Sequence, residues 1–201
     1  MSYLNKATLN ALAGGRHGNP FSLYGIHKED GLRVVRTFQP QAESVDLVLG
    51  SGTDPIAMQR VHADGIFEAK MPPRKRIYRF RVTGHSGHTW EVEDAYRFPS
   101  LLGDLDLYLI GQGSHRDIFR KLGAHPAFLL GVEGTFFAIW APNASRVSVV
   151  GEFNNWDGRC HVMRLHPGNG LWEIFIPGIG QGSYYKFELL DKQGELLPYK
   201  S

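Results

Sequence analysis

The chain has 201 residues, and its shares of hydrophobic residues (42%) and charged residues (21%) are typical of a folded globular protein rather than a disordered or membrane chain. The 22 Lys and Arg residues nearly balance the 20 Asp and Glu residues, so the composition does not favour nucleic acid as a partner. We recognise no signal peptide and no apolar run of roughly 18 residues that could span a membrane, and the single Cys160 excludes an intrachain disulfide. A reducing, cytoplasmic compartment fits these features best.

In chain order, the sequence predicts a helix over residues 5–13, a series of short strands, a helical region over residues 103–122, and further strands. Apolar residues recur at helical spacing in the first segment, whereas Asp104 and Ser114 are candidate N-caps and Gly123 a candidate stop of the second. The predicted strands are runs of Val, Ile, Phe and Tyr bounded by Gly, Pro, Asn or Asp, which is the usual pattern of β-structure. They cover residues 32–38, 45–49, 77–82, 135–140, 147–150, 171–176 and 184–190.

The two strand-rich blocks repeat each other. "DGIFEAKMP" parallels "NGLWEIFIP", "IYRF" parallels "YYKF", and a proline precedes a valine-containing strand in both blocks. The matching pairs are Pro40 with Pro142, Gly65 with Gly170, and Tyr78 with Tyr185. The repeat predicts an all-β fold of two tandem immunoglobulin-like sandwiches joined by a short helical linker.

The predicted boundaries are an N-terminal helical segment (1–15), a first β-sandwich (16–100), a helical linker (101–125) and a second β-sandwich (126–201). The second sandwich has only about 75 residues, fewer than a sandwich of roughly seven strands requires. We therefore expect it to lack its C-terminal strand, to expose a sheet edge there, and to belong to a chain that continues beyond Ser201.

Trp156, in "VVGEFNNWDG", is the main candidate for a binding residue. Asn154, Asn155, Asp157 and a glycine surround it, and all of these favour turns, so the indole is predicted on a loop. An exposed indole can cover the C–H face of a sugar ring while amides bond its hydroxyl rim. The alternative is that Trp156 folds back as a lid over the edge of the sandwich.

The other tryptophans have plainer interpretations. Trp140 alternates with buried-type residues and is predicted to pack in the core or at a domain interface, and Trp172 is predicted to be structural. Trp90 has no aromatic counterpart in the second block, and the sequence assigns it no function. Lys186, between two aromatic residues, is expected to point to the opposite strand face from theirs; it gains interest only if it shares a face with Trp156.

The sequence offers no site for a metal, a cofactor or catalysis. His85 and His88 lie in "HSGH", which is typical of a hairpin turn, and no cysteine or carboxylate set completes a zinc tetrahedron. The acidic residues are scattered over turns and strand ends, without a carboxylate pair or a nucleophile–base pair that stands out.

Several motifs together resemble one family. "NPFSLYGIH", "DGIFEAKMP", "GSHRDIFRKLGAHP", "TFFAIWAPNASRVSVVGEFNNWDGR", "MRLHPGNGLWEIFIP" and "YYKFELLDKQGELLPYK" look like the N-terminal region of bacterial 1,4-α-glucan branching enzymes. The resemblance implies two tandem early-set sandwiches, the second a carbohydrate-binding module of family 48. It also implies that a glycoside hydrolase family 13 barrel follows Ser201 and carries the catalytic carboxylates, so that these 201 residues alone are not an enzyme.

Related modules imply a glucan site in the second block. Family 48 modules that target glycogen bind glucan through the tryptophan of an "FNxW" motif and the lysine of a "YKF" motif, which match Trp156 and Lys186; Asn154 and Asn155 complete the candidate site. The second tryptophan of those modules is absent, with Tyr199 the nearest aromatic residue after the "KQG" turn. The first block has "GSGTDP" instead and is expected to be a spacer or positioning domain.

The implied function is therefore a segment that binds glycogen or maltooligosaccharides and positions them for a branching enzyme. The alternative is a pair of purely structural sandwiches that dock onto the catalytic barrel without glucan affinity of their own. Debranching enzymes and trehalohydrolases also carry family 48 modules, but the extra first block favours a branching enzyme.

Overall fold

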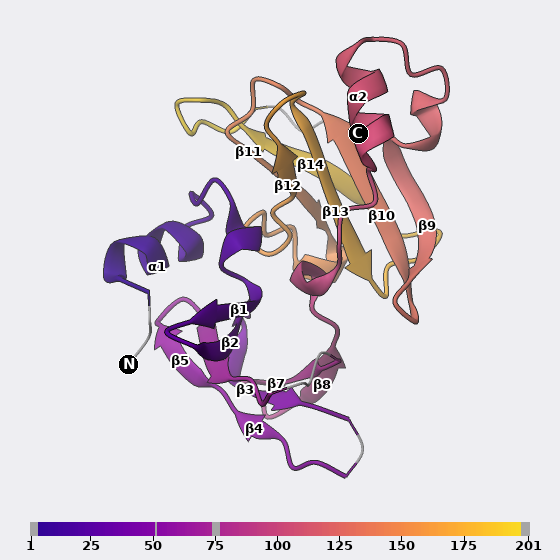
Figure 1. Cartoon of the computed structure of the whole chain (residues 1–201). Coiled ribbons are helices and arrows are strands. Elements are labelled where there is room, and N and C mark those ends of the chain that lie inside the picture. Colours follow the sequence, from indigo (N-terminus) through magenta and orange to yellow (C-terminus); the bar gives the residue numbers. More distant parts are fainter. Residues whose placement is uncertain (1–3, 51, 74–76, 198–201) are drawn as a thin grey trace. The chain divides into compact units, whose positions relative to one another are not determined.

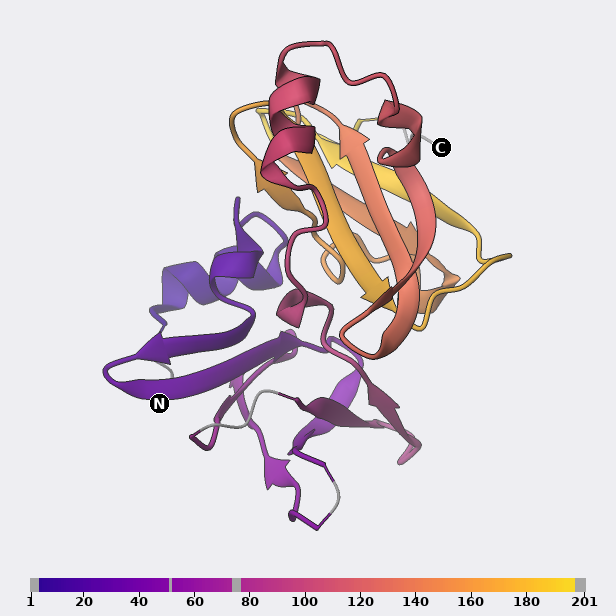
Figure 2. The same ribbon diagram turned by 45° about the vertical axis from the view of Figure 1, so that its right-hand side comes forward.

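The computed structural model describes residues 4–50, 52–73 and 77–197. The chain divides into two compact units, Met1–Arg97 and Phe98–Ser201, each built mainly of antiparallel sheets (Figures 1 and 2). The all-β, immunoglobulin-like prediction is confirmed.

The first unit packs two four-stranded sheets, with strand orders β1-β2-β6-β5 and β4-β3-β7-β8. Side chains that alternate inward from both sheets, among them Val35, Leu47, Phe67 and Phe80, form one core. The elements are α1 (Lys6–Ala13), a 3₁₀ turn (Pro20–Ser22), β1 (Gly25–Glu29), β2 (Leu32–Phe38), β3 (Ala42–Val48), β4 (Ile56–Ala57), β5 (Gln59–His62), β6 (Ile66–Lys70), β7 (Arg79–Gly84), β8 (Thr89–Val92) and a 3₁₀ turn (Ala95–Arg97).

The second unit has a four-stranded sheet of order β12-β13-β10-β9 and a two-stranded sheet β11-β14. Its helix α2 precedes the sheets, as Figure 1 shows. The elements are α2 (Asp104–Gly111), a 3₁₀ turn (Ile118–Arg120), β9 (Gly123–Leu129), β10 (Val132–Trp140), β11 (Arg146–Gly151), a 3₁₀ turn η4 (Glu152–Asn154), β12 (Arg164–His166), β13 (Leu171–Pro177) and β14 (Tyr185–Leu190).

The internal repeat extends to the topology. The order β1-β2-β6-β5 recurs as β9-β10-β13-β12, and the pair β3–β7 recurs as β11–β14. The repeated glycines have one reason in common: a Cβ on Gly65 would lie 2.4 Å from the Gln39 carbonyl oxygen, and one on Gly170 would lie 2.5 Å from the Cα of Pro142. Both glycines also have a positive φ, so the backbone crossing itself requires them.

The edge beyond β14 differs from its counterpart. In the first unit β8 pairs with β7 over residues 89–92. In the second unit, within the part of the chain up to residue 197, an isolated bridge from Leu190 to Leu196 takes that place. Tyr199 and the final residues lie outside the described residues, so the prediction of a missing last strand stays a prediction.

The helical region predicted over residues 103–122 is shorter than expected. Helix α2 ends at Gly111, and Gly113 follows with a φ of 66°. The N-cap is Gly103 rather than Asp104, because the carboxylate of Asp106 turns back and accepts a hydrogen bond from the Gly103 N–H at 3.3 Å. The N-cap prediction for Asp104 was therefore wrong.

The segment before α2 is attached to the second unit. The ring centroids of Phe98 and Phe175 lie 4.6 Å apart, and the carboxylate of Glu173 accepts hydrogen bonds from the backbone N–H groups of Leu101 and Leu102. Because its apolar side chains join the core of that sheet, this segment is part of the unit rather than a separate linker in the described structure.

Candidate functional site

The loop between β11 and β12 presents Trp156 to solvent. After η4, Asn155 and Trp156 both adopt left-handed backbone conformations, with φ of 53° and 59°. The Trp156 N–H donates to the Gly151 carbonyl at 2.9 Å, which fixes the reversal. A bulky residue with positive φ is strained, by roughly 1 to 2 kcal/mol. Trp156 is 41% exposed at the apex of this loop, so its side chain is neither buried in the core nor fully exposed to solvent.

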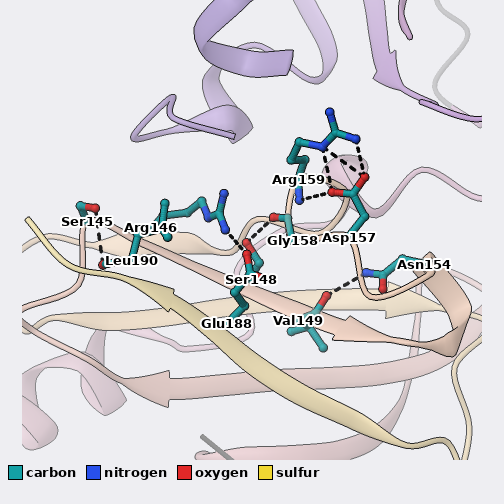
Figure 3. Close-up of polar contacts among 10 residues, drawn as sticks. All are labelled: Ser145, Arg146, Ser148, Val149, Asn154, Asp157, Gly158, Arg159, Glu188 and Leu190. Carbon is teal, nitrogen blue, oxygen red and sulfur yellow. Dashed lines mark hydrogen bonds and ion pairs between the residues drawn. The ribbon is translucent and has the colours of Figure 1, made fainter. Parts of the chain in front are cut away.

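The side chain of Asn154 fixes the loop by hydrogen bonds inside the protein. Its Oδ1 accepts from the Gly151 N–H at 2.9 Å, while its Nδ2 donates to the Val149 carbonyl at 2.9 Å and to Nδ1 of His161 at 2.8 Å. Burial lowers the pKa of His161 to about 4, which keeps the ring neutral and its Nδ1 available as an acceptor. Both hydrogens of the Asn154 amide are therefore used inside the protein, and the residue is buried. Figure 3 shows the bond to Val149.

Gly158 presses the far side of the loop against the outer face of the β11–β14 sheet. The Ser148 hydroxyl donates to the Gly158 carbonyl at 2.6 Å, and a Cβ on Gly158 would lie 1.8 Å from Oε1 of Glu188 (Figure 3). The same Glu188 carboxylate forms a buried ion pair with Arg146. Only a glycine at position 158 leaves room for this ion pair. The glycine of the "DG" after Trp156 is therefore required for packing against Glu188.

Asp157 forms an ion pair and several hydrogen bonds with Arg159. The Asp157 carboxylate accepts from the Arg159 backbone N–H at 2.9 Å, from Nε at 2.9 Å, and from a terminal nitrogen at 2.7 Å. Burial alone would raise the pKa of Asp157, but the hydrogen bonds from Arg159 outweigh it and hold the pKa below its usual range. Asp157 is thus ionised and paired, and its role in the described structure is to stiffen the loop (Figure 3).

Lys186 lies on the same face of the sheet as this loop. In the β11–β14 register Lys186 is opposite Val150, two pairs along from Ser148 and Glu188 and therefore on the same side of the strands. Ser148 bonds to Gly158, and Glu188 lies against it. Its neighbour Tyr185 points the other way, with its ring centroid 4.9 Å from that of Phe137. The exposed Lys186 and the Trp156 loop therefore share the outer face of this sheet.

The structure separates the four predicted site residues into two kinds. Trp156, Asn155 and Lys186 are on the surface, whereas Asn154 is buried and supports the loop. Sequence reasoning missed His161 and Gly158 as loop supports. The alternation of polar and apolar residues in "RVSVVG" and "KFELL" is typical of strands with one solvent-exposed face, so these segments carry no signal that the loop covers the outer face of the sheet.

The two other tryptophans of this unit differ from each other. Trp172 is 1% exposed and donates from Nε1 to the Ala141 carbonyl at 3.0 Å, which confirms its structural role. Trp140 is 59% exposed, so it does not pack in the core, and the alternative of packing at a domain interface stays a prediction. The pairing of β10 with β9 ends at Ala138 and Gly123, whereas the pairing of β10 with β13 continues to Trp140 and Leu171. The Nε1 of Trp140 donates to the Asn169 carbonyl at 2.9 Å.

No group of three or more His, Cys, Asp and Glu side chains among the described residues could hold a metal ion. No helix within the described ranges is long and apolar enough to cross a membrane.

Comparisons with known proteins match the two units one by one. Residues 5–96 match the family described as "alpha-1,4-glucan branching enzyme GlgB, N-terminal domain", and residues 121–199 match "Carbohydrate-binding module 48 (Isoamylase N-terminal domain)". The chain is 50% identical over 198 residues to the 1,4-alpha-glucan branching enzyme GlgB of Paramagnetospirillum magneticum, a match that covers 98% of this chain and 26% of that protein.

A second relative gives the same result. The chain is 51% identical over 193 residues to the 1,4-alpha-glucan branching enzyme GlgB of Rubrobacter xylanophilus, covering 96% of this chain and 26% of that protein. It thus spans about a quarter of the length of these curated relatives. Among solved structures, a pullulanase from Anoxybacillus sp. LM18-11 aligns over 84% of this chain and 24% of that chain with 16% identity, at a TM-score of 0.30, which is too low to carry an argument.

Proposed function

Because the chain belongs to the N-terminal region of the GlgB family, with a GlgB N-terminal domain followed by a carbohydrate-binding module 48 domain, we propose that its second unit binds α-glucan and positions it for a branching enzyme. The observation that carries this proposal is the half-exposed indole of Trp156 at the apex of a rigid loop. The substrate class is glycogen or a maltooligosaccharide. The branching reaction itself, transfer of an α-1,4-linked segment to form an α-1,6 branch, is assigned to the remainder of a full-length protein.

Three side chains would make the contact. The indole of Trp156 covers the C–H face of a glucose ring, while Asn155 and Lys186, both exposed, donate hydrogen bonds to the hydroxyl rim. Asn154 acts indirectly, as a positioning residue, because its amide is used inside the loop. A stiff loop favours binding, since little conformational entropy is lost when the ligand arrives.

A second role, docking onto another part of a full-length enzyme, is favoured by a different observation. The second unit exposes Trp140 and, on α2, Leu105 and Tyr108, which lie among its large exposed apolar side chains. Exposed aromatic residues of this size are typical of protein interfaces. The partner would be the catalytic barrel, and this role is compatible with glucan binding at Trp156.

The glucan proposal is tested by affinity electrophoresis of the 201-residue chain in native gels with and without glycogen. We expect glycogen to retard the wild type. Trp156→Ala should lose most of this retardation, since one aromatic platform contributes roughly 1 to 3 kcal/mol, or up to about a hundredfold in affinity. Trp140→Ala is the matched control, because it removes another exposed indole, at 59% against 41% for Trp156, elsewhere on the same unit. Equal retardation of wild type and Trp156→Ala would refute the proposal.

A further inference from the structure

The first unit contains an open pocket at the tip of the β7–β8 hairpin. Its volume is about 560 Å³. It is lined by the hairpin residues Gly84, His85, Ser86, His88 and Trp90 and, from the corner between β2 and β3, by Pro40 and Gln41. The hairpin turn is tight, because the Gly84 N–H donates to the His88 carbonyl at 2.9 Å and the Gly87 N–H donates to the Gly84 carbonyl at 2.8 Å. The pocket therefore lies on a fixed part of this unit (β7 and β8 in Figure 1).

Two rings form one wall of the pocket. Trp90 pairs with Val82 across the strands and packs against the core, which holds the indole in place. The rings of His88 and Trp90 are nearly parallel, with 19° between their planes and 5.8 Å between their centroids. Gly84 leaves the space that this arrangement needs, since a Cβ there would lie 3.2 Å from Cζ3 of Trp90. His88 and Trp90 therefore line the pocket as one aromatic pair.

The rest of the lining is mostly polar and includes a second histidine, His85. Among the described residues that line the pocket, none is Lys, Arg, Asp or Glu. Gln41, Ser86 and His88 are exposed and offer amide, hydroxyl and imidazole groups. No Lys, Arg, Asp or Glu in the lining favours a charged ligand, whereas a flat, hydroxylated ligand would find both an apolar face and hydrogen-bonding partners.

We propose that this pocket is a second saccharide site, formed by the first unit and separate from the site at Trp156. Trp90 supplies the platform, and Gln41 and Ser86 bond the hydroxyl groups. The choice of an α-1,4-glucan as ligand rests on the function proposed for the second unit, while the pocket itself does not. Two weak sites on one chain bind a polymer such as glycogen more tightly than either site alone, provided that one glucan can reach both.

The test uses the indole N–H signals of the full chain in two-dimensional ¹H–¹⁵N NMR. The chain has four tryptophans, so each gives one indole signal, which the corresponding Trp→Phe variant assigns. Titration with maltoheptaose should shift the Trp90 signal. The signals of Trp140 and Trp172 should stay in place, because their N–H groups are bonded to backbone carbonyls inside the second unit.

The outcomes for the two sites are read separately. A shift of the Trp156 signal tests the proposed function, and a saturable shift of the Trp90 signal tests this second site, even if Trp156 does not respond. The double variant Gln41→Ala/Ser86→Ala changes only exposed side chains, so folding is not at risk, and it should weaken the Trp90 response roughly tenfold. A Trp90 signal that does not move at saturating maltoheptaose, or a response unchanged in that double variant, would overturn the proposal.

Discussion

Acidification should loosen the second unit through His161. The ring is buried with its pKa lowered to about 4, whereas an unfolded histidine has a pKa of about 6.5. The neutral ring therefore stabilises the folded state fully above pH 6.5, and this contribution is lost as the pH falls toward 4. At about 1.4 kcal/mol per pH unit, lowering the pH from 7.5 to 5 should reduce the free energy of unfolding of this unit by about 2 kcal/mol.

Hydrogen exchange measured by mass spectrometry can follow this change locally. After correction for the intrinsic pH dependence of exchange, peptides from residues 146–163 should open about 30-fold more often at pH 5 than at pH 7.5, the equivalent of about 2 kcal/mol. In His161→Gln the side chain is neutral at both pH values, so most of this difference should disappear although the starting stability is lower. Equal pH dependence in the wild type and in His161→Gln would refute the assignment to this ring.

Three further changes follow from the same structure. Burial raises the pKa of Asp94 to about 6, so the folded state binds this proton more readily than the unfolded state. Lowering the pH from 8 to 5 should therefore increase the free energy of unfolding of the first unit by about 1 kcal/mol, and Asp94→Asn should abolish this increase in the same exchange experiment. Gly158→Ala should destabilise the second unit by about 1 to 3 kcal/mol in urea unfolding, because its Cβ would meet Glu188, whereas Gly168→Ala, with no atom within 4 Å, should be neutral. Trp156→Gly should be about 1 kcal/mol more stable than Trp156→Ala, since glycine tolerates the positive φ.

The sequence predicts regular structure best where pattern and punctuation agree. Strand β2 occupies the predicted residues 32–38, because an apolar run there lies between Gly31 and Pro40. Helix α1 begins after Asn5, whose side chain accepts from the Thr8 N–H at 2.9 Å, as an N-cap should. These features depend on neighbours in the sequence, and local rules are sufficient for them.

The site was less predictable, because its geometry depends on residues that the fold brings together. Turn-forming residues around Trp156 indicated a loop, but its exposure follows from contacts between Asn154 and His161 and between Gly158 and Glu188. The second of these spans 30 positions in the sequence, and strand register alone creates it. Residue type suggested Asn154 as a ligand for sugar, whereas the structure gives its amide three partners inside the protein.

Backbone strain separates the Trp156 loop from the shared scaffold. Within the described residues, four residues other than glycine have a positive φ. Asp30 and Leu130 each precede a glycine in the two-residue turns of the hairpins β1–β2 and β9–β10, where both positions need a positive φ and both units use the same solution. Asn155 and Trp156 do not lie in the turn of a β-hairpin, but in the loop between β11 and β12. Glycine at either position would build the same reversal with less strain, so folding alone does not require a tryptophan there. The sugar contact proposed for the exposed indole would account for a tryptophan at this strained position.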